Sequence, residues 1–312
     1  MQITAPAMAV ADKAIVVPEV YSAKYIDTIL NICRREQIDA LFSLNDLELP
    51  ILVSENKKFE KIGVKLVISN EEVIDTCFDK YKTILFCKQL QINFPKTFLM
   101  LDEARDALTK GIFKLPVIVK PRWGSASIGI ECAETIEELE MAYHLVSLKI
   151  SKGMLYEASK QHLDQAVMIQ EKIDGIEYGL DILNDFSGHT VAIYVKEKLA
   201  MRAGETDKAV LRNKPDLEAL GLHIGNHLGH IGNLDCDIFE SNGNYYLLEM
   251  NPRFGGGYPF SHFAGANYPA AICSWIEGHT FDFAGFTKEF DNPYAKCDTL
   301  IRVRKIDESS SI

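Results

Sequence analysis

Four oxygen-bearing side chains in the 312-residue chain have the type and spacing to bind a metal ion. Asp235 and Asp237 are two residues apart, as are Glu249 and Asn251, and the segment between the pairs has the turn residues of a β-hairpin. Alternate residues of a strand share a face, so the hairpin would present all four groups together. Such hard oxygen ligands suit Mg²⁺, which combines carboxylates with substrate phosphates. The spacing does not decide which aspartate binds.

Two further observations favour a metal over a solvated hairpin face. Carboxylates that face each other across strands repel, so a cation is expected between them. Residues 245–248 are apolar, which indicates a largely buried strand.

Arg253 and the glycines at 255–257 follow the hairpin directly. Arginine binds a phosphate or a carboxylate bidentately, so Arg253 is a candidate catalytic residue. Glycines permit left-handed or otherwise strained backbone and the close approach of a bound group. A flexible loop is the alternative for the glycines, but their position after the metal-ligand strand favours the active site.

A strand that ends at Lys120 runs into a loop of small residues that includes Gly124, Ser125 and Ser127. Small residues let backbone N–H groups approach phosphate oxygens, and a lysine adds a positive charge. The segment is not a Walker A loop, because it lacks G-K-[ST]. A plain turn with a surface lysine explains it equally well.

A third segment, 170–177, joins an apolar strand to a turn between acidic residues. Lys172 and Ile173 could offer backbone groups to an adenine edge, and Glu177 could accept from ribose hydroxyls. Taken alone, a solvated turn is the preferred interpretation. The charged run 196–208, which contains Arg202, is equally compatible with a solvated face and with a substrate or phosphate loop.

The elements that would position these residues follow from hydrophobic periodicity. Residues 14–68 alternate short apolar runs at 14–17, 40–44 and 65–68 with helical patterns at 24–35 and 47–59, which predicts a parallel βαβαβ layer. The usual opening strand and glycine turn of such a sheet are not recognisable, so a truncated or minimal domain is expected. Strands at 116–120, 129–132 and 166–171 follow, with a helix at 136–148. Hairpins are expected at 178–196 and 236–250, with a helix at 217–229 between them.

Composition narrows the function classes. A net charge of −11 argues against nonspecific binding to nucleic acid. Seven scattered cysteines without a C-x-x-C pair fit a reducing cytoplasm, and no apolar run is long enough for a membrane span. The sequence therefore predicts a cytoplasmic protein that acts on small molecules.

Taken in order, these segments resemble the ATP-grasp superfamily, in particular one half of the carbamoyl-phosphate synthetase large subunit. The resemblance covers residues 11–276 and also rests on Asp79-Lys80. It implies that Lys80 and Lys120 contact the phosphates or base of ATP, and that the loop 124–128 closes over the triphosphate. It further implies that Glu171, Ile173 and Glu177 hold adenine and ribose, while Glu249 and Asn251 bind Mg²⁺ with Asp235 or Asp237.

The resemblance also implies a fold and a reaction. The expected fold is a pre-ATP-grasp α/β domain at 1–75, a two-lobed ATP-grasp domain with antiparallel sheets at 76–285, and an extension at 286–312. The lobes would cover about 113–175 and about 176–285. The expected enzyme is a carboxylate-amine ligase that uses ATP and Mg²⁺, or Mn²⁺, to make an acyl phosphate from a carboxylate or bicarbonate.

Three points stay open after the resemblance. Arg202 lies in a segment without a counterpart in the common motif, and we expect it to help define the acceptor. A homodimer or a partner subunit is the expected assembly. The alternatives are a non-catalytic nucleotide-binding regulatory module and the ATP-grasp subunit of a split carbamoyl-phosphate synthetase.

Overall fold

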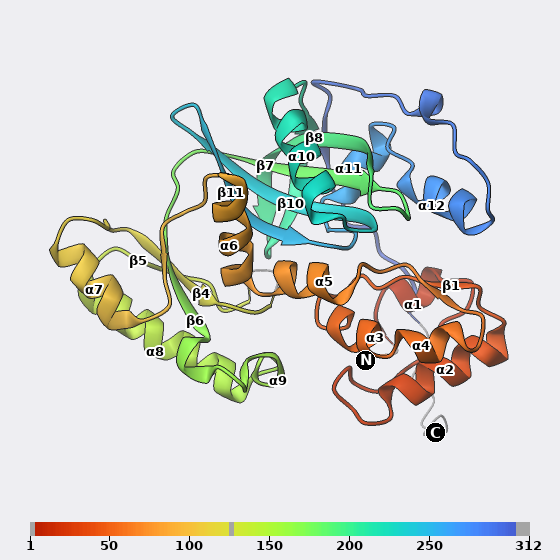
Figure 1. The fold of residues 1–312 in the computed structure, drawn as a ribbon, viewed down its shortest axis with the longest axis horizontal. Helices are drawn as coiled ribbons and strands as arrows, with labels where there is room; N and C mark the ends of the chain where they lie inside the picture. The colour runs from red at the N-terminus through yellow and green to blue at the C-terminus, as the bar shows by residue number, and fades with distance from the viewer. Residues whose placement is uncertain (1–3, 125–127, 304–312) are drawn as a thin grey trace. The chain divides into compact units, whose positions relative to one another are not determined.

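The computed structural model describes residues 4–124 and 128–303 (Figure 1). The chain separates into two compact units. One comprises Met1–Leu41, Glu55–Leu66 and Lys296–Ile312, and the other comprises Phe42–Ser54 and Val67–Ala295. The domain boundaries expected near residues 75 and 285, and between the lobes, stay predictions.

The smaller unit contains a two-stranded parallel sheet. β1 (Ala40–Leu41) pairs with β2 (Lys65–Leu66), and the helices of the unit are α1 (Ala7–Val10), α2 (Tyr25–Glu36) and α4 (Asn56–Glu60). α2 buries Tyr25, Leu30 and Cys33 on one stripe. The expected strand at 14–17 is absent, because these residues pair with no other described strand. The helix expected at 47–59 is two helices, since Glu55 leaves the helical conformation.

The larger unit contains a four-stranded antiparallel sheet in the order β3-β6-β4-β5. Its strands are β3 (Thr97–Phe98), β4 (Val117–Pro121), β5 (Glu131–Ala133) and β6 (Val167–Glu171). Nearby helices are α7 (Leu101–Thr109), α8 (Ile136–Lys152) and α9 (Tyr156–Ser159), with the short 3-10 helix Leu163–Gln165. α8 buries Leu139, Ala142, Val146 and Ile150 in the core that includes β4 and β6. We call this sheet with α7, α8 and α9 the small lobe.

The same unit contains a six-stranded antiparallel sheet in the order β11-β10-β7-β8-β9-β12. Its strands are β7 (Ile176–Asn184), β8 (Thr190–Arg202), β9 (Glu205–Leu211), β10 (Gly232–Ser241), β11 (Asn244–Asn251) and β12 (Pro293–Ala295). The remaining helices are α3 (Leu49–Ser54), α5 (Glu71–Phe78), α6 (Lys80–Leu90), α10 (Pro215–Leu228), α11 (Tyr258–Phe263), α12 (Tyr268–Ile276) and the 3-10 helix Phe283–Gly285.

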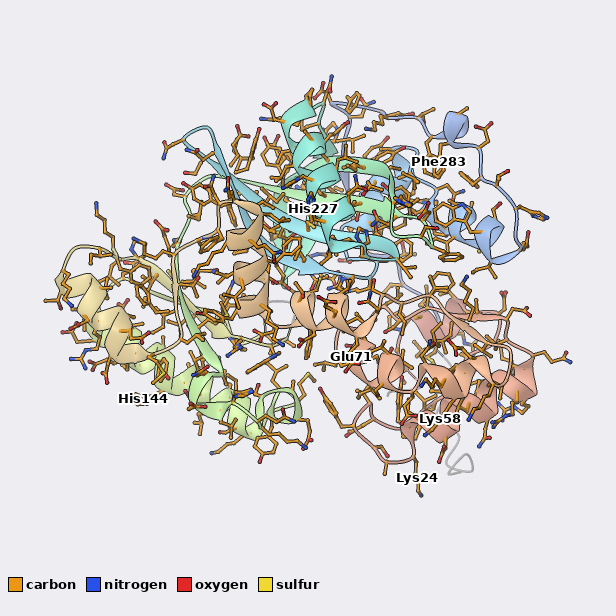
Figure 2. The ribbon with its side chains drawn as sticks, in the orientation of Figure 1. Lys24, Lys58, Glu71, His144, His227 and Phe283 are labelled. Atoms are coloured by element: carbon orange, nitrogen blue, oxygen red, sulfur yellow. The ribbon has the colours of Figure 1, made fainter. Side chains whose placement is uncertain are left out.

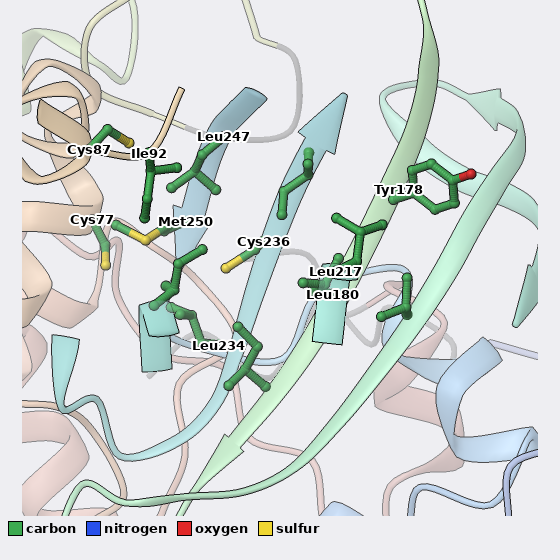
Figure 3. Packing of buried hydrophobic residues seen from close by; sticks show 14 of the residues in the cluster. Cys77, Cys87, Ile92, Tyr178, Leu180, Leu217, Leu234, Cys236, Leu247 and Met250 are labelled. Carbon is green, nitrogen blue, oxygen red and sulfur yellow. The ribbon is translucent and has the colours of Figure 1, made fainter. Parts of the chain in front are cut away.

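One face of the six-stranded sheet forms the main apolar core (Figure 3). Leu180, Leu234, Cys236 and Met250 are all fully buried there, packed with residues of α5, α6 and α10. Residues of alternate parity therefore point to the opposite face, and that face carries the charged side chains.

The expected fold class is confirmed, since the chain is mixed α/β with a small parallel sheet and larger antiparallel sheets. Both expected hairpins form, as β7–β8 and β10–β11. The charged run at 196–208 is a hairpin of β8 with β9. Among the described residues, no helix is both long and apolar enough to span a membrane.

Candidate functional site

A buried ion pair positions Lys80 against the end of β4. Asp79 caps α6 by accepting from the backbone N–H of Tyr81 at 3.0 Å. Its two carboxylate oxygens accept from Nε and Nη2 of Arg122, each at 2.7 Å. The N–H of Lys80 also donates to the Arg122 carbonyl at 3.2 Å. Bidentate pairing of this kind fixes both backbones, so Lys80 and Lys120 lie at one place.

Lys80 and Lys120 line a narrow cleft of about 20 Å³, which has room for about one water molecule. Gly124 and Glu249 line it as well. Nζ of Lys80 donates to the Gly124 carbonyl and lies 3.8 Å from Oε1 of Glu249. We call this site the cleft.

Lys120 lies in the cleft without a hydrogen bond or ion pair to any residue in the described ranges. Its side chain is almost fully buried, with 3% of the residue exposed. Burial lowers the pKa of Lys120 to about 8, although the charge of Glu249 acts in the opposite direction. A buried ammonium without a partner is unfavourable, and a bound anion would remove that penalty.

Glu249 and Asn251 share a face of β11, as the sequence predicts. Asp237 pairs in register with Glu249, and Asp235 pairs with Asn251. The Asn251 side chain is buried and has no hydrogen-bond partner in the part of the chain that the structure describes. Within the described ranges, the one polar contact of the Glu249 side chain is with Nζ of Lys80 at 3.8 Å. The side-chain oxygen atoms of these two residues are therefore available to coordinate a metal ion.

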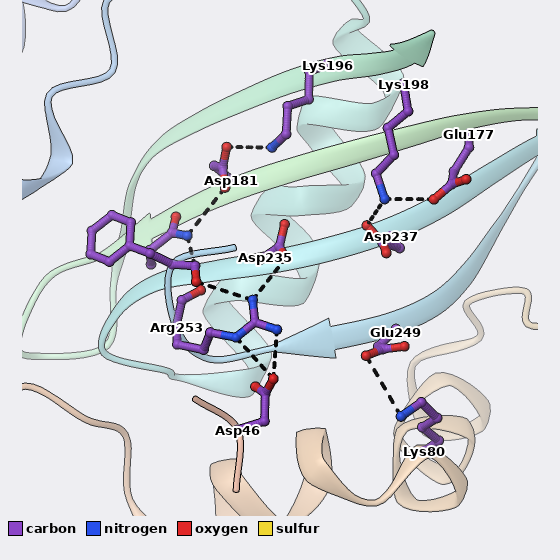
Figure 4. A network of polar contacts seen from close by, with 12 residues as sticks. Asp46, Lys80, Glu177, Asp181, Lys196, Lys198, Asp235, Asp237, Glu249 and Arg253 are labelled. Atoms are coloured by element: carbon purple, nitrogen blue, oxygen red, sulfur yellow. Dashed lines mark hydrogen bonds and ion pairs between the residues drawn. The ribbon is translucent and has the colours of Figure 1, made fainter. Parts of the chain in front are cut away.

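Side-chain cations neutralise Asp235 and Asp237 (Figure 4). Oδ1 of Asp237 accepts from Lys198 at 2.6 Å, and Oδ2 of Asp235 accepts from Arg253 at 3.2 Å. The argument that repulsion between these carboxylates requires a metal is therefore wrong, because lysine and arginine supply the positive charge. Among residues 4–124 and 128–303, no three His, Cys, Asp or Glu side chains are grouped to hold a metal ion.

Glu177 belongs to the same network of charges. Its Oε1 accepts from Lys198 at 2.7 Å, so Lys198 bridges two carboxylates. Burial raises the pKa of Glu177, while the charge of Lys198 opposes the shift. Burial alone would lower the pKa of Lys198, but Asp237 and Glu177 outweigh it and raise it. The structure thus brings Glu177 to Asp237.

Arg253 is bound by two carboxylates of the protein itself. Its Nε and Nη2 donate to Oδ2 of Asp46 at 3.1 and 2.7 Å, and its Nη1 donates to Asp235. Burial and the charge of Asp237 raise the pKa of Asp235 to about 6, although Lys196 and Arg253 act against this. The donors of Arg253 that would bind a phosphate are therefore directed at Asp46.

Gly255, Gly256 and Gly257 make room for these side chains. A Cβ at Gly255 would lie 2.0 Å from Oδ2 of Asp235, and one at Gly257 would lie 2.7 Å from Cε of Lys196. None of the three has a positive φ, so left-handed backbone is not the reason for glycine. The close approach predicted from the sequence occurs, but the approaching groups belong to the protein.

A fully buried ion pair completes the network. Nζ of Lys196 donates to Oδ2 of Asp181 at 2.5 Å, and the two side chains are 1% and 0% exposed. Ser261 donates to the same oxygen at 2.5 Å. We call this set of ion pairs the paired row, and its members are Asp46, Glu177, Asp181, Lys196, Lys198, Asp235, Asp237 and Arg253.

The segment predicted to bind adenine lies apart from the cleft. Glu171, Lys172 and Ile173 line a polar pocket of about 440 Å³ together with the β10–β11 turn. The backbone of Lys96 donates to Oε2 of Glu171 at 3.2 Å. The pocket and the cleft share no lining residue, but β6 runs through both regions because Met168 pairs with Lys120.

Two further predictions concern loops. Arg202 ends β8, and its Nε lies 2.8 Å from Asp207. Glu205 of the same hairpin lies beside Gly256, so this turn adjoins the glycine segment.

Gly124 has a φ of 111°, and a Cβ there would lie 2.9 Å from Leu155, which explains the glycine. Ser125 and Ser127 lie outside the described residues.

The sequence interpretation did not assign four members to the paired row, since it missed Asp46 and Asp181 and named Lys196 and Lys198 only within the charged run 196–208. Strand alternation contains the signal for three of them, because Lys196 and Lys198 share one face of β8 and Asp181 lies on β7 beside it. No local pattern points to Asp46, which is 207 residues from Arg253.

Family models match two parts of the chain. Residues 1–67 match the PylC-like N-terminal domain. Residues 164–293 match a model described as ATP-grasp in the biosynthetic pathway with Ter operon. The second match covers β7–β11 and with them every member of the paired row except Asp46.

Similarity to individual proteins extends further along the chain. The carbamoyl phosphate synthase large chain of Helicobacter pylori is 24% identical over 248 residues, which are 76% of this chain and 22% of that protein. The chain thus spans less than a quarter of that relative's length. The biotin carboxylase domain of Hydrogenobacter thermophilus 2-oxoglutarate carboxylase has a TM-score of 0.71 at 16% identity, covering 91% of this chain and 64% of that one. N5-carboxyaminoimidazole ribonucleotide synthetase gives 0.67 at 14% identity, covering 92% and 71%.

These findings agree with the resemblance seen in the sequence and with the observed architecture. At these identities the structural neighbours establish the fold alone. The chain is therefore similar to the PylC-like N-terminal domain over residues 1–67, to an ATP-grasp model over residues 164–293, and to carbamoyl phosphate synthase large chains over most of its length.

Proposed function

We propose that the protein is an ATP- and Mg²⁺-dependent ligase of the ATP-grasp type. It would transfer the γ-phosphoryl group of ATP to a carboxylate or to bicarbonate, and an amine would then displace phosphate from the acyl phosphate. The relatives point the same way, since carbamoyl phosphate synthase is a ligase and one structural neighbour was solved with MgADP and bicarbonate.

The observation that carries the proposal is the charge state of the cleft. Lys120 is a buried cation without a partner among the described residues, and Lys80 and Glu249 lie beside it. Phosphoryl transfer depends on positioning and on charge neutralisation more than on covalent help. Two lysine ammonium groups fixed at one place would supply both to a triphosphate.

Glu249 and Asn251 are the residues that would hold Mg²⁺, with Mn²⁺ as the alternative ion. They lie on one face of β11 and have no strong partner in the described protein. Magnesium takes one or two protein carboxylates and completes its shell with phosphate oxygens and water, so two protein donors are sufficient. The bound ion would neutralise charge on the phosphates. Asp235 or Asp237 would join through the carboxylate oxygen that does not pair with Arg253 or Lys198.

The acceptor would lie near Arg253 and the β8–β9 turn. Glu205, at the end of that turn, lies beside Gly256 of the glycine segment, and this supports a role for Arg202 in binding the acceptor. Asp46 now receives the Nε and Nη2 donors of Arg253. Arg253 would therefore stabilise a phosphoryl group or acyl phosphate only if that group displaced Asp46.

The remaining assignments rest on the relatives and on the sequence. Glu171, Lys172 and Ile173 are proposed to hold adenine, with Glu177 on the ribose. Small-molecule carboxylates and amines are the proposed partners, in the cytoplasm. The two rival functions are the non-catalytic nucleotide-binding module and the ATP-grasp subunit of a split carbamoyl-phosphate synthetase.

ADP release with bicarbonate and with a panel of carboxylates and amines tests the proposal. Replacing Glu249 with alanine should abolish ADP release and leave the circular dichroism spectrum intact. Glu103→Ala removes an exposed carboxylate from α7 and should leave turnover unchanged. Unchanged turnover in the Glu249 variant would contradict the metal assignment. Nucleotide binding without ADP release from any combination would favour the regulatory module.

A further inference from the structure

The outer face of α8 carries an apolar stripe that no other part of the described chain covers. Met141 is 64% exposed, Leu145 is 43% exposed and Leu148 is 49% exposed. Figure 2 shows His144 at the outer edge of the same helix. The buried face of α8 is complete without these residues, because Leu139, Ala142, Val146 and Ile150 pack in the core. The stripe is therefore not needed for folding of the small lobe.

The spacing of the stripe is that of a helix-packing seam. Met141, Leu145, Leu148 and Lys152 follow one another at intervals of four, three and four residues. At about 100° per residue they lie within a narrow arc of the helix, as the contact positions of packed helices do.

The charges at the ends of the stripe have opposite signs. Glu137 extends it at the N-terminal end and Lys152 at the C-terminal end, and both are exposed. Neither has an ion pair or a hydrogen bond to a residue in the described ranges. An acidic side chain at the N-terminal end of a helix and a basic one at the C-terminal end also interact favourably with the helix dipole. That interaction does not prevent either side chain from pairing with an opposite charge on another molecule.

The stripe is symmetric about the middle of the helix. Glu137 and Lys152 are equally distant from the midpoint between His144 and Leu145, and so are Met141 and Leu148. If a second α8 lay antiparallel across it, Glu137 would face Lys152 of the other copy. Met141 would face Leu148, and Leu145 would face His144. A two-fold axis requires this self-complementarity.

We propose that α8 is an interface through which two copies of this chain associate, with the two helices antiparallel. The charge complementarity of the stripe with itself favours a second copy over an unrelated partner. A single pair of 17-residue helices, each about 25 Å long, is at the small end of specific interfaces. The dissociation constant is therefore expected on the order of micromolar or weaker.

Charge reversal tests the pairing directly. In sedimentation velocity over a micromolar concentration series, Glu137→Lys alone should weaken the dimer about fivefold or more, because the introduced ammonium group would face Lys152 of the other copy. Lys152→Glu alone should do the same. The double variant E137K/K152E restores opposite charges across the two-fold axis, so it should return the dissociation constant to that of the unmodified protein.

A matched leucine variant tests the apolar contact. Leu145→Glu places two carboxylates near the axis and should weaken association more than about tenfold. Leu222→Glu on α10 changes a helix leucine of similar exposure, 46% against 43%, and should have no effect. Circular dichroism confirms that each variant is folded.

Several outcomes would overturn the proposal. A protein that is monomeric throughout the concentration series has no such interface. A dimer that survives Leu145→Glu, or one whose charge variants are not rescued by the double variant, uses another surface. None of these outcomes bears on ATP turnover, because α8 contributes no residue to the cleft.

Discussion

The cleft and the paired row differ in how their buried charges are neutralised. In the paired row each charged side chain meets an opposite charge of the protein, as Lys196 meets Asp181. In the cleft, Lys120 is buried without a partner among the described residues, and so is Asn251 two residues after the cleft residue Glu249. A satisfied buried charge holds the fold together, whereas an unsatisfied one implies a ligand. The presence or absence of an opposite charge thus distinguishes the side chains that stabilise the fold from those that would bind a ligand.

The largest expected effect is on the paired row. Replacing Lys196 with methionine leaves Asp181 fully buried and without its cation, and this should lower the free energy of unfolding by about 3–5 kcal/mol. Urea denaturation measures the change. Lys160→Met removes an exposed lysine paired with Glu157 and should change stability by less than about 1 kcal/mol. Equal losses in the two variants would show that Lys196 is no more structural than a surface lysine.

His230 tests whether burial alone, without an ionic partner, limits stability. Its ring is fully buried and Nε2 donates to the Ile182 carbonyl at 3.0 Å. Burial lowers the pKa of His230 to about 4 from the usual 6.5. Stability is then complete above pH 6.5 and falls as the pH drops toward 4, because the unfolded chain binds the proton first. The loss should reach about 3 kcal/mol, measured by urea denaturation at each pH.

The control for this pH dependence is His230→Gln, which keeps a side-chain donor and removes the titration. Its unfolding free energy should vary less over the same range. If the variant loses as much stability as the unmodified protein, the acid sensitivity belongs to other groups.

A smaller loss is expected where the glycine segment contacts the paired row. Gly255→Ala would bring a methyl group to 2.0 Å from Oδ2 of Asp235, which Arg253 holds in place. Overpacking of this kind costs about 1–3 kcal/mol. Gly285→Ala meets nothing within 4 Å and should be neutral in the same denaturation experiment. A neutral result at Gly255 would mean that Asp235 moves freely, which the paired row does not allow.

The smallest effect on stability is expected in the cleft. Lys120→Met removes a buried ammonium without a partner among the described residues, so the free energy of unfolding should stay within about 1 kcal/mol or rise. The affinity for MgATP should nevertheless fall about 10- to 100-fold, because a charge-assisted contact to phosphate is lost. Isothermal titration calorimetry measures the binding. A large loss of stability with unchanged MgATP affinity would show that Lys120 stabilises the fold and does not bind the nucleotide.

Strand alternation made much of the site predictable. It places Asp235, Asp237, Glu249 and Asn251 on one face, and the register confirms this. The neutralisation of the two aspartates was not predictable. Asp237 lies on β10 and Lys198 on β8, and β7 lies between these two strands in the sheet. The sequence also shows lysines at 196 and 198 as a charged run, which is usually solvated, and only the sheet order reveals that β8 is central.

The pair Asp79–Arg122 has a mechanical consequence. Asp79 immediately precedes Lys80, and Arg122 follows Lys120 by two residues, so one bidentate link ties the start of α6 to the end of β4. α6 packs on the six-stranded sheet and β4 belongs to the four-stranded one, so this link would lie at the pivot if the two sheets rocked against each other. Both ammonium groups would stay beside that pivot. Their spacing would survive the movement. Opening and closing would then change how deeply a phosphate chain enters, while the distance between its two anchoring charges stays constant.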